Sequence, residues 1–127
     1  MVNSSSSPYR PHQLGKAGEA AAVAYLIDAG YSIINQNWRG AHGEIDIIAR
    51  CESHHPEFVV VEVKTRSSLQ CGTPLEAVTS TKYRRLFLLG REWISTYQPG
   101  ALWRIDVLAL LRSASGFHIT HHKGLIA

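Results

Sequence analysis

The sequence has few cysteines and no long hydrophobic run, which excludes disulfide-rich domains and membrane-spanning helices. Its two cysteines, Cys51 and Cys71, are too few for a disulfide framework, and their spacing matches no zinc motif. No apolar run approaches the roughly 20 residues that span a bilayer, so no membrane partner is expected. The opening residues, MVNSSSSPYRPH, lack the apolar centre of a secretory signal. These absences favour a cytoplasmic protein with reduced thiols.

Acidic residues are scarce after position 62, although the net charge is only +3, with an isoelectric point near 9.1. This balance weakly favours a polyanionic partner. Segment 44–62 holds five acids against one base, whereas segment 64–91 holds six bases against one acid. Such a distribution suits a metal site beside a phosphate-binding track, and it is also typical of a solvated helix face next to a turn. The five acids are Glu44, Asp46, Glu52, Glu57 and Glu62, and the six bases are Lys64, Arg66, Lys82, Arg84, Arg85 and Arg91.

Apolar periodicity predicts a single α/β domain with the order helix, three strands, helix, two strands. Residues 1–12 are rich in serine and proline and are expected to form a flexible tail, so the domain covers residues 13–127. Gly30 is placed to end the first helix, and Thr79 or Ser80 can cap the second. The order predicts a mixed, largely antiparallel sheet flanked by helices. The predicted helices are 13–29 and 81–97, and the predicted strands are 31–38, 43–50, 58–65, 102–111 and 116–122.

The third predicted strand, FVVVEVKTR, carries two charges directly after its most apolar part. Position 54 is the midpoint between Asp46 and Glu62, so a hairpin folded symmetrically there places these two residues opposite each other. Side chains on one face of a sheet recur every second residue, which puts Lys64 on the same face. Because two opposed carboxylates destabilise a bare sheet, Lys64 and a divalent cation are the natural compensating charges.

The first predicted helix supplies a further carboxylate, Glu19. The positions three, four and seven residues later are Ala22, Val23 and Leu26, so Glu19 heads an apolar stripe that should face the sheet. A glutamate near a helix start can instead simply favour the helix dipole. The functional interpretation places Glu19 beside the other two acids.

Asp46, Glu62 and Lys64 form the pattern D, fifteen residues, E-x-K, which resembles the PD-(D/E)xK, or restriction-endonuclease-like, nuclease superfamily. The predicted order of elements is similar to that superfamily's core. The chain resembles more closely the YraN-like family of small bacterial proteins, which is similar to archaeal Holliday-junction resolvases. The sequence departs from the superfamily's name at one position, where Ile45 stands in place of proline. That proline has no chemical role. The resemblance is carried by LGKAGEAAA (14–22), NWRGAHGEIDIIA (37–49), VVVEVKTRSS (59–68), GTPLEAVTSTKYRRL (72–86) and RIDVLAL (104–110).

These residues suit metal-assisted phosphodiester hydrolysis. Magnesium prefers oxygen ligands and is typically held by one or two carboxylates, here Asp46 and Glu62, with manganese as an alternative ion. Lys64 would hold the attacking water and stabilise charge on the phosphoryl group. Glu19 would complete the outer shell or bind the metal directly. The resemblance to related nucleases adds the backbone carbonyl of Val63 as a further ligand.

Four basic residues are candidates for nucleic-acid binding. Arg66 follows the E-x-K strand and could clamp a phosphate, and the resemblance makes Lys82 a site or phosphate-contact residue. Arg84 and Arg85 lie on the same helix, whose alternative interpretation is a solvated basic edge. The expected function is a magnesium-dependent nuclease acting on DNA, with branched or structured DNA as candidate substrates. The alternative is a non-catalytic nucleic-acid-binding or adaptor module. Junction cleavage needs two sites, which leaves a homodimer open.

The remaining polar residues have structural alternatives. Trp38 and Arg39 could stack on bases or cover the edge of the core. The histidines of segment 116–122 are expected to belong to an edge strand and not to a metal cluster, since only some share a strand face. Arg104 and Asp106, within an apolar strand, are expected to form structural pairs, and Asp106 could alternatively orient another polar group.

Overall fold

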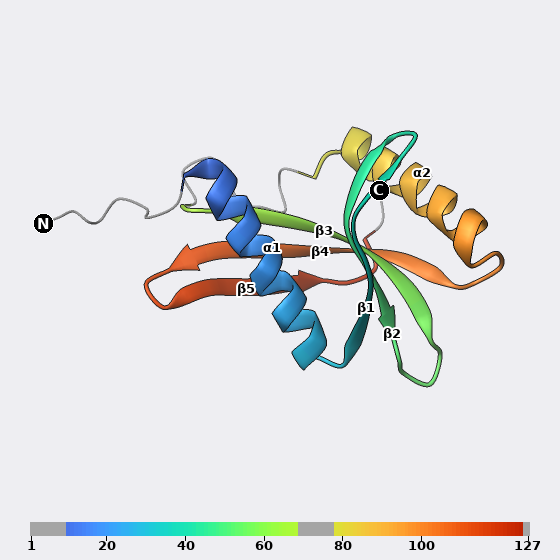
Figure 1. The fold of residues 1–127 in the computed structure, drawn as a ribbon, viewed down its shortest axis with the longest axis horizontal. Helices are drawn as coiled ribbons and strands as arrows, with labels where there is room; N and C mark the ends of the chain where they lie inside the picture. Colours follow the sequence, from blue (N-terminus) through green and yellow to red (C-terminus); the bar gives the residue numbers. More distant parts are fainter. Residues whose placement is uncertain (1–9, 69–77, 126–127) are drawn as a thin grey trace, which may run out of the picture.

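The computed structural model describes residues 10–68 and 78–125, and it has the predicted order of elements (Figure 1). Two helices and five strands alternate as the sequence predicts, each within two residues of its predicted bounds. Among the described residues, neither helix is long and apolar enough to cross a membrane. The elements are α1 (Pro11–Asp28), β1 (Tyr31–Gly40), β2 (Gly43–Cys51), β3 (Glu57–Arg66), α2 (Ser80–Tyr97), β4 (Trp103–Ser113) and β5 (Gly116–His122).

The five strands form one mixed sheet in the order β1-β2-β3-β4-β5. Neighbouring strands are antiparallel except β3 and β4, which are parallel and are joined through α2. The register of β2 and β3 runs from Ile47↔Val61 to Cys51↔Glu57. This register confirms the predicted centre of the hairpin at residue 54, although the pairing ends one residue before Asp46 and Glu62.

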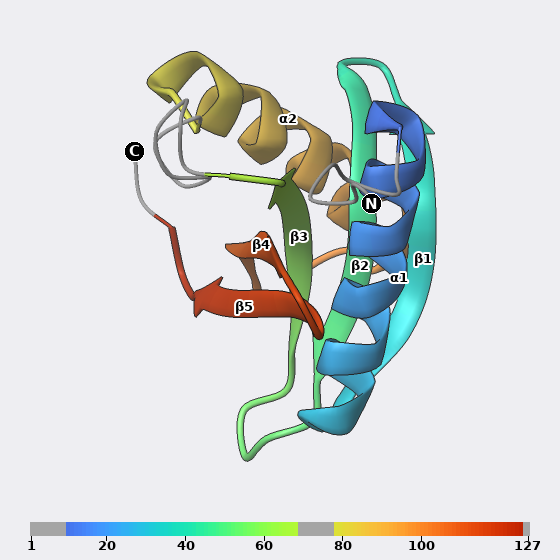
Figure 2. The same cartoon turned by 90° about the vertical axis from the view of Figure 1, so that its left-hand side faces the viewer.

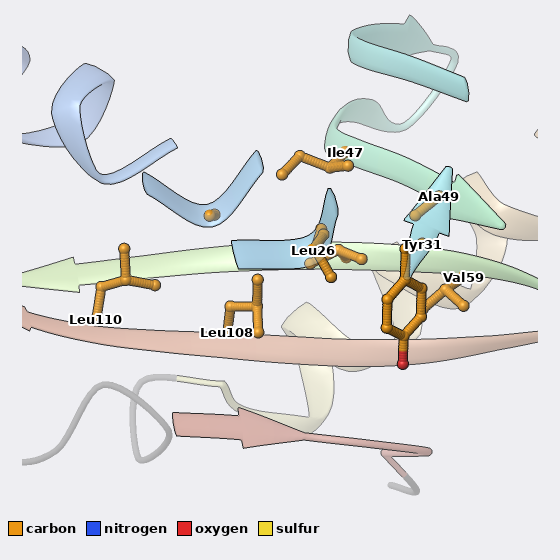
Figure 3. Packing of buried hydrophobic residues seen from close by; sticks show 9 residues of the cluster. Leu26, Tyr31, Ile47, Ala49, Val59, Leu108 and Leu110 are labelled. Carbon is orange, nitrogen blue, oxygen red and sulfur yellow. The ribbon is translucent and has the colours of Figure 1, made fainter. Parts of the chain in front are cut away.

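The two helices cover opposite faces of the sheet (Figure 2). On the α1 face, Ala22 and Leu26 pack against Ile47, Val61 and Leu108, and all five are fully or almost fully buried (Figure 3). Ala22 and Leu26 are four residues apart, so their side chains lie on one face of α1. Burying a leucine such as Leu26 contributes about 1.5–3 kcal/mol, so this layer fixes α1 firmly to the sheet.

The α2 face has its own apolar cluster, in which Leu86, Leu89 and Trp93 pack against Ile48 and Val60. β3 therefore runs between two apolar layers from Phe58 onward, which explains its uninterrupted apolar run. Its last residues, after position 62, are only half-buried. The central strand thus leaves the core directly after Glu62, which is itself still buried.

The helix ends follow from local sequence. α1 begins at Pro11, two residues earlier than predicted, because proline is well suited to the first helical position. It ends before Gly30, whose φ of 96° is readily adopted only by glycine. At α2, Thr79 and not Ser80 is the cap: its hydroxyl oxygen accepts a hydrogen bond from the backbone N–H of Lys82 at 3.3 Å.

Candidate functional site

One cavity, with a volume of about 430 Å³, opens between the end of β3 and the first half of α1. Five successive residues of β3, from Glu62 to Arg66, line it, so the cavity surrounds the end of the strand and is not confined to one face. β2 contributes Asp46. The lining residues are Pro11, Leu14, Gly15, Glu19, Asp46, Glu62, Val63, Lys64, Thr65 and Arg66.

Asp46 lies where the pairing of β2 with β3 stops. The last paired residues are Ile47 and Val61, and beyond them the backbone N–H of Val63 donates to Asp46 Oδ2 at 2.8 Å. The carboxylate thus replaces the missing strand partner. β2 is irregular at this point, since Ile45 packs on the α2 face and Ile47 on the α1 face. In a regular strand these two side chains would share a face.

The partner of Asp46 on β1 is Asn37, a residue that sequence reasoning missed. Gln36 pairs with Ile47 and Trp38 with Ile45, which leaves Asn37 opposite Asp46. Asn37 has a φ of 53°, in the left-handed region that asparagine tolerates better than most residues. Its side chain hydrogen-bonds to Glu19 from α1. The sequence signal was an asparagine inside a predicted strand, where this residue type is depleted.

Glu19 reaches the cavity because α1 approaches β3 closely at Gly18. A Cβ atom at Gly18 would collide with the side chain of Thr65, so any larger residue would push the helix away from the strand. Glycine inside an alanine-rich helix costs stability, which was the available sequence signal for this close approach. The glycine sets the distance from α1 to the sheet, and Glu19 is the next residue along the helix.

Glu62 and Lys64 form an ion pair within the cavity. Lys64 Nζ lies 3.0 Å from Glu62 Oε2, and the two side chains are only 17% and 9% exposed, respectively. Arg66, two residues further on, also lines the cavity, and its guanidinium donates to the carbonyl oxygen of Thr65 at 3.2 Å. Partial burial strengthens the ion pair between Glu62 and Lys64 relative to an ion pair on the open surface.

The carboxylates of the cavity disfavour one another's charge. Burial and the neighbouring charge of Glu62 raise the pKa of Asp46 to about 7, although the Val63 N–H opposes the shift. Burial also raises the pKa of Glu19, with contributions from Glu44 and Glu62, against the hydrogen bond from Asn37. Lys64 lowers the pKa of Asp46 but does not outweigh burial and repulsion. The cavity therefore favours an added positive charge.

The donor set of the cavity fits magnesium in its chemistry. Asp46, Glu62 and Glu19 offer carboxylate oxygens, and one or two carboxylates with water suffice for this ion. Within residues 10–68 and 78–125, no three His, Cys, Asp or Glu side chains form a group that could hold a metal ion, so at most two of these carboxylates would bind one directly. An ion held here would thus keep other ligands, as magnesium usually does.

The predicted nucleic-acid-binding residues separate into two places. Arg66 lines the cavity, whereas Lys82, Arg84 and Arg85 lie on the first turns of α2 and do not. The Arg85 side chain lies beside Gly43, in the hairpin between β1 and β2. Arg84 is exposed, and Lys82 is half-buried. The structure thus brings Glu19, Asp46, Glu62, Lys64 and Arg66 together and leaves the three α2 bases elsewhere.

A second polar cluster lies on β4. Asp106 is fully buried, and both of its oxygens bond to the Arg104 guanidinium, at 2.9 and 3.1 Å. Its Oδ2 lies 2.7 Å from His121 Nε2, and its Oδ1 accepts from the Gly124 N–H at 2.9 Å. Arg104 also bonds to Glu57 at 2.6 Å. The predicted structural pairing of Arg104 with Asp106 is confirmed, as is the edge position of β5.

Trp38 and Arg39 take structural positions. The Trp38 ring packs against the apolar cluster under α2 and meets the Tyr97 ring edge-on at 6.3 Å. Arg39 is exposed and forms an ion pair with Glu44 at 3.6 Å. Of the two interpretations of Trp38, stacking on bases or covering the edge of the core, the second describes its position.

Residues 18–110 match the uncharacterised protein family UPF0102. The chain belongs to this family. The match spans α1 from its close contact with β3 through most of β4, and it includes Glu19, Asp46, Glu62 and Lys64. The YraN-like resemblance seen in the sequence is confirmed at this level.

Relatives within UPF0102 are similar along almost their whole length. A UPF0102 protein of Leifsonia xyli is 46% identical over 112 residues, covering 87% of this chain and 92% of the relative. One from Bacteroides thetaiotaomicron is 41% identical over 112 residues, covering 88% and 90%. One from Chloroflexus aurantiacus is 41% identical over 122 residues, covering 94% and 95%. Because the family is described as uncharacterised, the function must be argued from the site itself.

Proposed function

We propose that this UPF0102 protein is a metal-dependent nuclease that hydrolyses phosphodiester bonds. The observation that carries the proposal is the gathering of Glu19, Asp46 and Glu62 around one cavity, with Lys64 as the single amine. Three carboxylates against two cations, Lys64 and Arg66, leave one surplus negative charge. Burial and repulsion from Glu62 accordingly raise the pKa of Asp46. A divalent cation relieves such a surplus, and perturbed groups in a cleft are typical of functional sites.

Each residue has a defined role in this proposal. Asp46 and Glu62 would hold magnesium or manganese, with Glu19 in the outer shell and the Val63 carbonyl as a further oxygen donor. When bound, the ion would lower the pKa of a water molecule and neutralise charge on the phosphoryl group. Lys64, held near Glu62 by their ion pair, would orient the attacking water and stabilise the charge that develops on the phosphate oxygens.

The resemblance to PD-(D/E)xK nucleases supports the same assignment. The pattern of Asp46, Glu62 and Lys64 on adjacent strands, after a helix that carries Glu19, is the pattern of that superfamily. The similarity to Holliday-junction resolvases makes branched or structured DNA the proposed substrate. Cutting a junction on both sides requires two sites, so a homodimer accompanies the proposal. Arg66, beside the carboxylates, would contact a phosphate of the bound strand.

The test compares the wild-type protein with Asp46→Asn and with Glu52→Gln, which neutralises a carboxylate in the turn after β2. Linear, nicked, flapped and four-way DNA are incubated with magnesium or manganese. Losing a residue that only orients a metal ligand typically costs about 10–100-fold, so Asp46→Asn, which alters a direct ligand, should reduce cleavage by about 100-fold. Glu52→Gln should cut like the wild type.

Thermal midpoints with and without magnesium give a second readout. An ion that binds only the folded protein stabilises it by about 2.7 kcal/mol at 100 times its Kd, so magnesium should raise the wild-type midpoint. It should leave the Asp46→Asn midpoint nearly unchanged. If magnesium shifts neither protein and no substrate is cut, the nuclease proposal fails, and a non-catalytic nucleic-acid-binding or adaptor module takes its place.

A further inference from the structure

The solvent side of α2 borders two adjoining hollows that the proposed catalytic cavity does not include. One, of about 440 Å³, is lined by Ser80, Tyr83, Arg84 and Phe87. The other, of about 370 Å³, shares Tyr83 and Phe87 and adds Arg91 and Trp103. We call the six residues Ser80, Tyr83, Arg84, Phe87, Arg91 and Trp103 the α2 groove.

The helical residues of the α2 groove form one continuous stripe. Ser80, Arg84, Phe87 and Arg91 follow one another at intervals of four, three and four, which places them on one face of the helix. The stripe is about 16 Å long, at 1.5 Å for each residue. Two arginines therefore flank an aromatic ring along an extended track.

The aromatic side of the groove is built by a close packing of helix and strand. A Cβ atom at Gly90 would collide with the Trp103 ring, so glycine allows that ring to lie directly against α2. The Trp103 and Phe87 rings are 5.5 Å apart at 34°, and the Arg91 guanidinium lies 5.9 Å from the Phe87 ring centre. Phe87 remains 40% exposed, so its ring is available to a ligand.

The groove is positively charged and uncompensated among the described residues. No carboxylate of residues 10–68 or 78–125 lines either hollow, and neither Arg84 nor Arg91 forms an ion pair with any residue of these ranges. The one acid of α2, Glu92, is turned the other way and accepts from the Ala41 N–H at 2.9 Å. A ligand of the groove should therefore be anionic as well as aromatic.

We infer that the α2 groove binds single-stranded nucleic acid. Bases would stack on Phe87 and Trp103, and phosphates would contact Arg84 and Arg91, because aromatic platforms beside positive charge are the usual means of holding single strands. Duplex DNA keeps its bases stacked internally and cannot use the rings. The inference deepens the proposed nuclease function, on which its link to cleavage rests, by assigning a substrate with a single-stranded arm.

The position of the groove suits such a substrate. β3 and β4 are parallel, and α2 carries the chain from the end of one to the start of the other (Figure 1). The first turns of α2, with Ser80 and Arg84, therefore lie toward the end of the sheet where the cavity opens. Trp103, at the start of β4, lies toward the opposite end.

The test measures binding of a fluorescein-labelled oligothymidylate of about 15 nucleotides by fluorescence anisotropy, in EDTA so that nothing is cut. Phe87→Ala should weaken binding roughly tenfold, because each stacked base contributes substantially. Arg91→Gln should reduce the slope of log K against log salt by about 0.7, as expected for one lost phosphate contact. A blunt duplex should lose little affinity in Phe87→Ala.

Two matched variants serve as controls. Ile27→Ala removes an exposed apolar side chain from α1, and Arg50→Gln removes a cation from the end of β2. Both should bind the single strand like the wild type. Circular dichroism and a thermal melt test whether Phe87→Ala is folded, as expected for the substitution of an exposed residue.

Several results would overturn the inference. The inference is overturned if the Phe87→Ala and Arg91→Gln variants both bind the single strand like the wild type. A wild type that does not bind the single strand but cuts duplex or four-way DNA would also refute the groove and leave the nuclease proposal standing. The converse result, strand binding without any cleavage, supports the groove and removes the nuclease proposal. If Phe87→Ala instead shifts the sedimentation of a dimer to that of a monomer with unchanged DNA binding, the groove is a contact between two copies.

Discussion

Asp46 and Asp106 belong to the same five-stranded sheet, but the groups around them are of opposite kinds. Asp106, on β4, is surrounded by donors: the Arg104 guanidinium, His121 and the Gly124 N–H. Burial alone would raise its pKa, but the hydrogen bonds with His121 and Arg104 outweigh burial and hold that pKa below its usual value. This carboxylate is fully buried and fully partnered.

Asp46 has one backbone donor, the Val63 N–H, and two carboxylates for neighbours. Lys64 offsets part of that charge but is itself engaged by Glu62. Burial and repulsion from Glu62 raise the pKa of Asp46 to about 7. The same sheet thus contains one carboxylate that the fold satisfies and one that it leaves in need of a cation.

The contrast separates a cluster whose charges are balanced within the fold from one whose charges are not. Burying a charge costs stability unless donors or an opposite charge accompany it, and the chain supplies these fully at Asp106. At Asp46, by contrast, the neighbouring side chains include two further carboxylates, Glu19 and Glu62. Such an arrangement disfavours stability, and exceptions of this kind are expected at functional sites, which supports the proposed cation.

The largest expected effect on stability comes from Asp106→Asn. The amide removes the negative charge and presents an NH₂ group to donors, leaving the Arg104 guanidinium partly uncompensated. Breaking a buried ion pair in this way typically costs about 3–5 kcal/mol. For a domain of this size the melting temperature should fall by roughly 10–20 °C. Urea unfolding followed by circular dichroism measures the loss.

Two variants bracket that result. Glu52→Gln, in an exposed ion pair, should change stability by less than about 0.5 kcal/mol. Asp46→Asn should hold or slightly raise stability in EDTA, since it relieves repulsion. If Asp106→Asn costs no more than Glu52→Gln, the β4 cluster does not stabilise the fold and the contrast is lost.

A smaller effect is expected in the pH dependence of stability, where the two residues should have opposite signs. The lowered pKa of Asp106 contributes stability that is present above about pH 4 and is lost as the pH falls through the folded pKa. The raised pKa of Asp46 makes the metal-free fold less stable as the pH rises from about 4, its unfolded pKa, to about 7.

The measurement is the free energy of unfolding in EDTA for the wild type, Asp46→Asn and Asp106→Asn between pH 3 and 8. The gap between wild type and Asp106→Asn should shrink below about pH 4. Asp46→Asn should gain on the wild type as the pH rises toward 7. Parallel curves for Asp46→Asn and the wild type would show that Asp46 ionises without penalty.

The fold followed from the sequence because local signals agreed with the global arrangement. The apolar run before Glu62 needed burial on both faces, which a central strand between two helices provides. The turn centred on residue 54 fixed the register of β2 and β3. Strand and helix bounds then followed from periodicity and from residues such as Gly30.

The candidate site was only partly accessible in the same way. Regular alternation brought Asp46 and Glu62 together in the prediction, but β2 is irregular there, with Ile45 and Ile47 on opposite faces. That irregularity involves the left-handed backbone of Asn37 on a neighbouring strand. A pattern of period two describes regular strands, so it contains no information about such a local departure.

The smallest expected effect is on DNA binding. It extends the contrast between partnered and unpartnered charges from carboxylates to cations. Arg104 is paired with Glu57 and Asp106, whereas Lys82 and Arg85 on α2 have no ion pair among the described residues. If Lys82 and Arg85 contact phosphates, replacing either with alanine should weaken DNA binding equally for all sequences. Each replacement should flatten the slope of log K against log salt by about 0.9 for duplex DNA, because one fewer counterion is released.

Stability and binding together make this last comparison decisive. An exposed or half-exposed cation without a partner contributes little to folding, so Lys82→Ala and Arg85→Ala should change the free energy of unfolding by less than about 0.5 kcal/mol. Arg50→Ala, at the far end of β2, provides the matched loss of charge and should leave the salt slope intact. Salt titrations of duplex binding by anisotropy measure all three. An unchanged slope in both α2 variants would assign Lys82 and Arg85 to a solvated helix edge, while a large loss of stability would mean that they compensate charge inside the fold, as Arg104 does.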